Sequence, residues 1–377
     1  MSNSKDASPI RDQDIEIKEI PDINAYIDII KAAKTGRLII FVGAGVSKLI
    51  GLPLWKEFAH KRLDEIFQRG LIDYRTYCDL KKQEPKKLLT ICKMFMAENG
   101  ITSQPAKEIF KIKDEYYKKY KDVYGKLYSM RAIYVTTNYD ECLDNFALNI
   151  VEDEDITAES SAYSNDSSRM TVKLKSPEGE IVINQSDLLE SKLQNGNVIH
   201  IHGSVNDENN MIVTLNDYML HYGSLSKDNH PELSIFLDRI FNTKYVVLFI
   251  GYGLEEYEIL EYMLSKVKNP EKTRKHYMLY ACFKEDKKLV SLLRKYYLGF
   301  GVELIPYDIG KKGYDQLITI IDKWSKVLNK LSNEQDYIQK MQFIDEVIED
   351  RSPKFNINAK AVIEMAKEDE SLEKYLF

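Results

Sequence analysis

The chain has 377 residues, of which 44% are hydrophobic and 30% charged, and its formal net charge is −6. This length accommodates one large domain or two with a sizeable core, and the composition is that of a soluble globular protein. The acidic balance argues against general nucleic-acid binding, although a local basic patch stays compatible with it.

The cysteines and the N-terminus indicate where the protein works. Cys78, Cys92, Cys142 and Cys282 form no C-x-x-C pair, which argues against a zinc ribbon and favours a reducing compartment. The polar segment 1–20 lacks the pattern of a signal peptide, and no apolar run approaches the length of a membrane span. We therefore expect a cytoplasmic protein without metal or membrane binding.

The first predicted elements are a helix, a buried strand and a second helix. Apolar positions at helical spacing follow Pro21, and Gly36 ends this helix. Residues 38–42 (LIIFV) form an apolar run bounded by glycine, which is typical of an internal parallel strand. An amphipathic helix is expected over 54–69.

The middle of the chain predicts a helical insertion, a loop and a hairpin. Residues 71–130 contain no convincing strand and predict three helices, broken near 83–85 and 100–105, that lie over one side of the sheet. The segment 151–169 is rich in Ser, Asp and Glu and predicts a loop. A hairpin is expected over 172–184.

Strand candidates recur to the end of the chain, at 132–136, 198–202, 245–251, 276–281 and 302–307. The apolar segment 211–215 and a helix near 231–242 lie between them. Strands that alternate with helices predict an α/β, Rossmann-like fold, with a mainly parallel sheet and helices on both faces. In such sheets, ligands bind outside the carboxyl ends of the strands.

Four short motifs each follow a predicted strand: GAGVS (43–47), TNYD (137–140), HGS (202–204) and GYG (251–253). Gly43 and Gly45 would let the main chain approach a phosphate closely. This turn alone is a weak signal, because Lys48 stands where the third glycine of G-x-G-x-x-G belongs and no Walker Gly-Lys-Ser/Thr follows. Four such motifs at four strand ends are a stronger indication of a ligand site.

Three polar side chains in these motifs could do chemistry: the carboxamide of Asn138, the carboxylate of Asp140 and the imidazole of His202. His200 and His202 are expected to point to opposite faces of their strand, with His202, nearer the strand end, in the cleft. No serine or cysteine lies in a G-x-S-x-G elbow, and no metal-ligand cluster is evident.

Structural roles remain open for several residues: helix capping for Asn138 and Asp140, a core position for His202, helix packing rather than a lid over a ligand for Trp55 and Phe58, and turn formation for Gly251 and Gly253. The basic and aromatic segment 107–121 also contains acidic residues, which favours a solvated helix over a nucleic-acid contact.

GAGVS, TTNYD, IHG and IGYG occur in the order and spacing of the sirtuin superfamily. Over roughly residues 22–325 the chain resembles the bacterial sirtuin-like NAD hydrolases of anti-phage defence. The resemblance implies that Gly43, Ala44, Gly45 and Ser47 cradle the NAD pyrophosphate, that Thr136, Asn138 and Asp140 lie along the nicotinamide ribose, that His202 is catalytic, and that Gly251 and Gly253 lie near the adenosine half.

Two features distinguish the chain from protein-deacylating sirtuins. It lacks their four-cysteine zinc module, and residues 51–55 (GLPLW) replace their G-I-P-D-F-R-type segment. Because the defence-type proteins share both features, the resemblance implies an NAD glycohydrolase that takes NAD as substrate. Asn138 would position water or a ribose hydroxyl, Asp140 would offset developing positive charge or fix a ribose hydroxyl, and His202 would accept a proton with an ordinary pKa of about 6.5.

We divide the chain into a polar segment (1–20), a catalytic domain (21–327) with insertions at 71–130 and 151–190, and a helical tail (328–377) for packing or oligomerisation. The resemblance implies a homo-oligomer that works with a separately encoded ATPase of the HerA type. We expect the partner or oligomerisation to gate the activity, because uncontrolled NAD hydrolysis is toxic.

Two other classes of function stay open. One is an NAD-dependent protein deacylase or ADP-ribosyltransferase, which the missing zinc module weakens. The other is a non-catalytic or nuclease-associated NAD-binding subunit of a DNA-targeting complex.

Overall fold

The computed structural model describes residues 16–148, 182–184, 188, 190–222, 231–241, 244–254, 256–266 and 276–332. In these ranges seven strands form one sheet in the order β3-β4-β2-β1-β5-β6-β7, and every recorded pairing between strands of the sheet is parallel. The strands are β1 (Leu38–Val42), β2 (Ile133–Thr136), β3 (Val182–Asn184), β4 (Val198–His200), β5 (Val246–Ile250), β6 (His276–Cys282) and β7 (Val302–Asp308). The predicted Rossmann-like α/β fold is confirmed.

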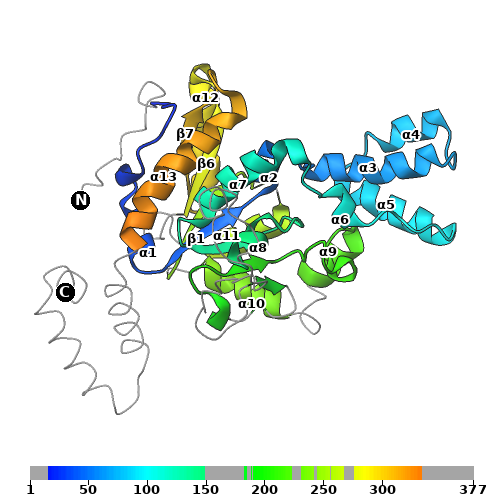
Figure 1. Ribbon diagram of the computed structural model, residues 1–377, viewed down its shortest axis with the longest axis horizontal. Helices are drawn as coiled ribbons and strands as arrows, with labels where there is room; N and C mark the ends of the chain where they lie inside the picture. Colours follow the sequence, from blue (N-terminus) through cyan, green and yellow to red (C-terminus); the bar gives the residue numbers. More distant parts are fainter. Residues whose placement is uncertain are drawn as a thin grey trace, which may run out of the picture.

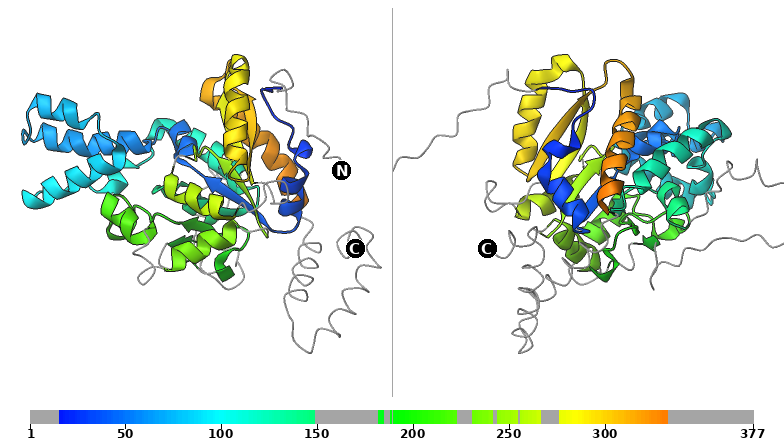
Figure 2. Two further views of the ribbon diagram at one scale, coloured as in Figure 1. Left: turned by 180° about the vertical axis from the view of Figure 1, so that it is seen from behind. Right: turned by 60° about the vertical axis from the view of Figure 1, so that its left-hand side comes forward.

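Helices cover both faces of the sheet (Figures 1 and 2). One face packs against α1 (Ile27–Lys34), α2 (Ala44–Leu49), α7 (Asp114–Tyr128), α8 (Cys142–Ala147) and α13 (Gln316–Ser332). The other packs against α9 (Leu215–Tyr222), α10 (Pro231–Ile240), α11 (Tyr257–Lys266) and α12 (Lys287–Leu298). Short 3₁₀ helices lie at η2 (Ile23–Ala25), η5 (Glu190–Lys192), η6 (Glu208–Asn210), η8 (Lys284–Asp286) and η9 (Gly313–Asp315).

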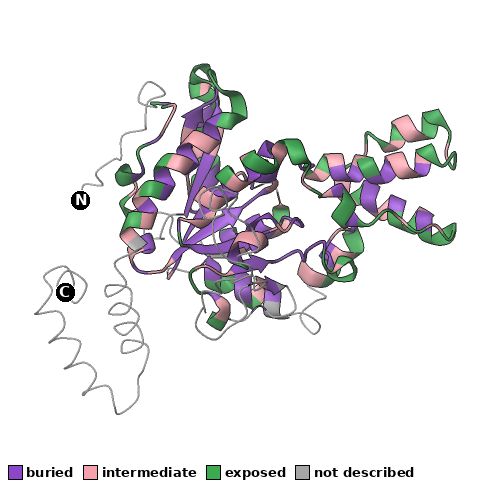
Figure 3. Ribbon diagram, viewed as in Figure 1, coloured by how far each residue is buried: buried purple, intermediate pink, exposed green. Residues whose placement is uncertain are grey.

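The central strand β1 is an uninterrupted apolar run because both of its faces are buried. All five of its residues are buried (Figure 3). Leu38, Ile40 and Val42 belong to one hydrophobic cluster and Ile39 and Phe41 to the other, because successive side chains of a strand point to opposite faces. A strand covered on both sides by helices has no polar face.

A helical lobe projects from the sheet on one side (Figure 1). It consists of α3 (Trp55–Gln68), α4 (Tyr74–Leu80), α5 (Pro85–Glu98) and α6 (Ala106–Ile109), and a third hydrophobic cluster fills it. The prediction of three helices over the sheet within 71–130 is wrong in two respects. This range holds four helices, and of these α7 packs in the cluster of the sheet face whereas α5 and α6 pack in the lobe.

Three further sequence expectations meet the structure. The apolar segment 211–215 is irregular over 211–214 and enters α9 at Leu215. β3 pairs in parallel with β4, while the other half of the predicted hairpin, the loop 151–169 and most of the tail lie outside the described residues. The domain division stays a prediction, and α13 runs across its boundary at 327.

Candidate active site

The carboxyl ends of β1, β2, β4 and β5 border a cavity of about 730 Å³. β1 is the strand at which the chain order reverses, with β2 and β4 on one side and β5 on the other. Open α/β sheets bind ligands at such a point, and the volume lies within the range of small-molecule sites. Residues of α3 and α5 bring the helical lobe to the opposite wall.

The glycine turns after β1 and β5 contact each other main chain to main chain. The amide of Gly45 donates to the Gly251 carbonyl over 2.8 Å. A Cβ on Gly43 would lie 2.5 Å from both the Gly251 oxygen and the Tyr252 Cα, and one on Gly45 would lie 2.7 Å from the same oxygen. Contact between two turns therefore requires these glycines, and it leaves Ala44 and Gly45 on the cavity wall.

Gly43→Ala is expected to lower the free energy of unfolding by about 1–3 kcal/mol, the usual cost of overpacking a rigid site. The added methyl meets backbone atoms, which cannot rotate away. Denaturant titration measures the change. Gly310→Ala is the control, because the nearest atom to its Cβ is the flexible end of Asp308 at 3.2 Å. Equal stability of the two variants would contradict the role given to Gly43.

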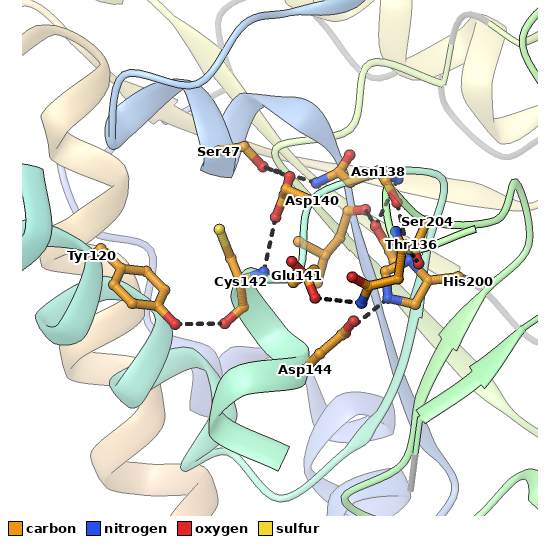
Figure 4. Close-up of polar contacts among 12 residues, drawn as sticks. Ser47, Tyr120, Thr136, Asn138, Asp140, Glu141, Cys142, Asp144, His200 and Ser204 are labelled. Atoms are coloured by element: carbon orange, nitrogen blue, oxygen red, sulfur yellow. Dashed lines mark hydrogen bonds and ion pairs between the residues drawn. The ribbon is translucent and has the colours of Figure 1, made fainter. Parts of the chain in front are cut away.

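Ser47 ties the β1 turn to the loop after β2 (Figure 4). Its hydroxyl donates to Asp140 Oδ2 over 2.7 Å and accepts from Asn138 Nδ2 over 3.0 Å, and it lies 2.9 Å from the Tyr124 hydroxyl. Asp140 Oδ1 also accepts from the Cys142 amide at the start of α8. Asp140 thus bonds the first amide of α8, although the N-cap residue of this helix is Glu141, and the bond from Asn138 to Ser47 orients the Asn138 amide.

The structure brings the predicted site residues to one place. Seven line the cavity: Ala44, Gly45, Asn138, Asp140, His202, Gly251 and Gly253. Gly43, Ser47 and Thr136 do not line it but hold the residues that do; Thr136 Oγ1 donates to the Val42 carbonyl and accepts from the Asn138 amide. Their roles toward a ligand stay predictions.

His200 is a buried structural residue. Its Nε2 lies 2.8 Å from Asp144 Oδ1 and its Nδ1 3.1 Å from the Asn138 carbonyl oxygen. Burial disfavours the imidazolium, but the Asp144 carboxylate and these hydrogen bonds outweigh it and raise the pKa of His200. His200 thereby holds the main chain of the loop that carries Asn138.

His202 faces the cavity for a different reason from the one expected. Residues two apart on a regular strand share a face, so alternation does not separate His200 from His202. β4 ends at His200, and the chain turns at residues 201–202. This turn, which the sequence did not predict, brings His202 to the cavity.

The imidazole of His202 is buried and uncharged. Its Nε2 lies 2.7 Å from the Tyr222 hydroxyl and 3.4 Å from Glu256 Oε2. Burial, with the nearby charges of Lys86 and His221, lowers the pKa of His202 to about 3. The expectation of an ordinary pKa is therefore wrong, and the ring is neutral across the physiological range.

Several cavity residues were absent from the sequence predictions. Glu256 follows the GYG motif by three positions, so extending the strand-end rule would have found it. Lys86, on α5, lies 2.7 Å from Glu258 Oε1 and 3.7 Å from the ring centre of Tyr218. Neither Lys86 nor Tyr218 carries a motif. Trp55 lines the cavity and also packs 5.7 Å from the Tyr139 ring.

Within the described residues, no cluster of three or more His, Cys, Asp or Glu is arranged to hold a metal ion. The four cysteines are free thiols. In the same part of the chain, no helix has the length and apolarity that crossing a bilayer requires.

Residues 132–300 match the family model of the SIR2-like domain. This part of the chain is therefore similar to the SIR2-like domain. The matched range of this domain includes Asn138, Asp140, His202, Gly251 and Gly253, whereas the β1 turn precedes it.

The chain is also similar to Defense-associated sirtuin 2 of Bacillus subtilis. The two are 25% identical over 341 residues, which cover 87% of this chain and 27% of the relative. The chain thus spans about a quarter of the length of the curated relative that it matches.

Proposed function

We propose that this chain is an NAD hydrolase that cleaves the nicotinamide–ribose bond and depletes NAD in anti-phage defence. The observation that carries the proposal is that residues of the β1 turn, Asn138 and His202 line one and the same cavity. Part of the chain also matches the SIR2-like domain. The name of the Bacillus subtilis relative supports a role in defence.

Cleavage of the nicotinamide–ribose bond does not require an acid catalyst. The nicotinamide ring carries a positive charge in NAD and leaves as a neutral molecule. Its departure therefore needs no proton. The protein must stabilise an oxocarbenium-like ribose and position a water molecule. Asn138 and Asp140, held by Ser47, supply a fixed amide and a carboxylate for these tasks.

The glycine turn supports binding of the pyrophosphate. Ala44 and Gly45 lie at the start of α2 on the cavity wall. The amides of Gly43, Gly45 and Val46 already donate to main-chain carbonyls, so the positive dipole end of the helix, rather than these amides, favours an anion. We assign the adenosine half of NAD to the side of Gly251 and Gly253, as the resemblance implies.

The test follows the products of purified protein incubated with NAD, with and without an acetylated peptide. Free nicotinamide and ADP-ribose without peptide support hydrolysis, whereas dependence on the peptide supports a deacylase. Silence in both conditions, even with a HerA-type ATPase added, would refute the proposal and favour a binding subunit. Phage plaque counts in cells that express the chain test the role in defence.

Assembly with other chains is also proposed to gate the NAD cleavage. We propose a cytoplasmic homo-oligomer that a HerA-type ATPase partner regulates. Analytical ultracentrifugation of the chain alone, and then with the ATPase, measures the assembly. NAD turnover that is equal for the monomer, the oligomer and the ATPase complex would contradict gating.

A further inference from the structure

Glu256 places an unused carboxylate oxygen beside the candidate catalytic residues. It lies between the β5 turn and α11, where its main-chain carbonyl accepts the amides of Ile259 and Leu260. The side chain is 21% exposed and lines the cavity, but its Oε2 is buried and has no hydrogen-bond partner among the described residues.

A buried carboxylate oxygen without a partner is costly, so its presence in a cavity indicates a partner that arrives with the ligand. His202 Nε2 lies 3.4 Å from Glu256 Oε2. That nitrogen already lies 2.7 Å from the Tyr222 hydroxyl. His202 Nε2 is therefore engaged, whereas Glu256 Oε2 makes no hydrogen bond of good geometry, and the side chains of Tyr252 and Thr137 lie beside the same carboxylate.

We propose that Glu256 is the catalytic base of the NAD cleavage described above, an inference that rests on the proposed function. The water oxygen bonds to C1′ of the nicotinamide ribose, and the C1′–N bond breaks with its electron pair passing to the pyridine nitrogen. The proton of the water passes to the partly exposed carboxylate of Glu256. The neutral imidazole of His202 orients the water or a ribose hydroxyl.

Titration of Glu256 agrees with this role. Burial raises the pKa of Glu256 to about 7, although the side chain of Tyr252 and the charge of Lys86 oppose the shift. A base is most effective when its pKa lies near the working pH. The groups that face this carboxylate or act on its charge are His202, Tyr222 of α9, Lys86 of α5, Tyr252 and Thr137 from the strand ends, and Glu258 of α11.

The sign of the pH dependence follows. The carboxylate is the active form of a base, so kcat/KM, which reports the free enzyme, should rise with pH through about 7 and level off above it. The same limb in kcat should lie at lower pH, because bound NAD favours the carboxylate. Glu256→Gln should lower kcat by about 10²–10⁴-fold and remove this limb of the profile. Glu256→Asp, which keeps the carboxylate, should retain the limb and part of the activity. Glu261→Gln is the control, since it removes a charge from an exposed position of α11 outside the cavity.

A binding measurement gives an independent readout. The cationic nicotinamide ring of NAD favours the carboxylate form of Glu256. Calorimetry in buffers of different ionisation enthalpy should therefore detect about half a proton released per NAD bound near pH 7. ADP-ribose, which lacks the cation, should release less, and Glu256→Gln should abolish the difference.

The outcomes separate the two proposals. No nicotinamide from the wild-type chain, with or without the ATPase, refutes the proposed function and this inference with it. An active wild type together with a folded Glu256→Gln variant of equal kcat and unchanged pH profile overturns the inference alone. A variant that raises only KM assigns Glu256 to binding and also overturns it.

Discussion

Asn138→Ala is expected to lower kcat for NAD cleavage by about 10²–10⁴-fold, the span typical of a positioned catalytic group. The amide is fixed on one side by its bond to Ser47, and the loop that carries it is fixed by Thr136 and His200. Such rigidity is what allows a side chain to position water productively. Nicotinamide release under saturating NAD measures the effect.

Asn99→Ala is the control for this variant, because Asn99 is an exposed residue at the end of α5, outside the cavity. Circular dichroism and thermal unfolding should show that Asn138→Ala stays folded. Full turnover in the folded variant would remove Asn138 from the catalytic group and leave it as a structural residue of the α8 loop.

His202→Ala is expected to cause a loss of similar size, about 10²–10⁴-fold in kcat. The variant removes the ring that lies between the Tyr222 hydroxyl and Glu256 Oε2. Because the pKa of His202 is lowered to about 3, the imidazole does not titrate near neutrality. The residual activity should therefore keep the shape of the wild-type pH profile while its level falls.

His60→Ala is the control, since His60 lies on α3, with its Nε2 3.1 Å from the Lys81 carbonyl oxygen, and does not line the cavity. Nicotinamide release across the pH range tests both statements. Loss of the limb near neutrality in His202→Ala would assign that limb to His202 and contradict the neutral imidazole.

The strands were predictable because their signal is local. Residues 38–42 and 246–250 are uninterrupted apolar runs. A strand of a parallel sheet that helices cover on both faces needs apolar residues at every position. The loops that follow them could be placed at one edge from the same fact, since parallel strands end at the same side. Seven of the ten predicted site residues line the cavity for this reason.

The packing partner of each helix was not predictable in the same way. An apolar stripe predicts a helix, but it does not say which surface the stripe meets. Leu88 of α5 packs in the helical lobe, whereas Tyr124 of α7 packs on the sheet, and both belong to the range assigned to one insertion.

The chemical state of the site residues depended on tertiary contacts. An isolated histidine and an isolated glutamate have unremarkable pKa values, yet burial lowers that of His202 and raises that of Glu256. Burial of this kind comes from α5, α9 and α11 together, which are far apart in the sequence.

By itself, the sequence determined the alternating strands and helices, the glycine turns and the position of Asn138, Asp140 and His202 at strand ends, because apolar periodicity and turn residues act over a few positions. Only the tertiary structure decided that a turn after β4, rather than strand alternation, brings His202 to the cavity, and that Glu256 Oε2 lies beside it without a hydrogen bond. Distances and desolvation between distant segments set these features, and no local pattern records them.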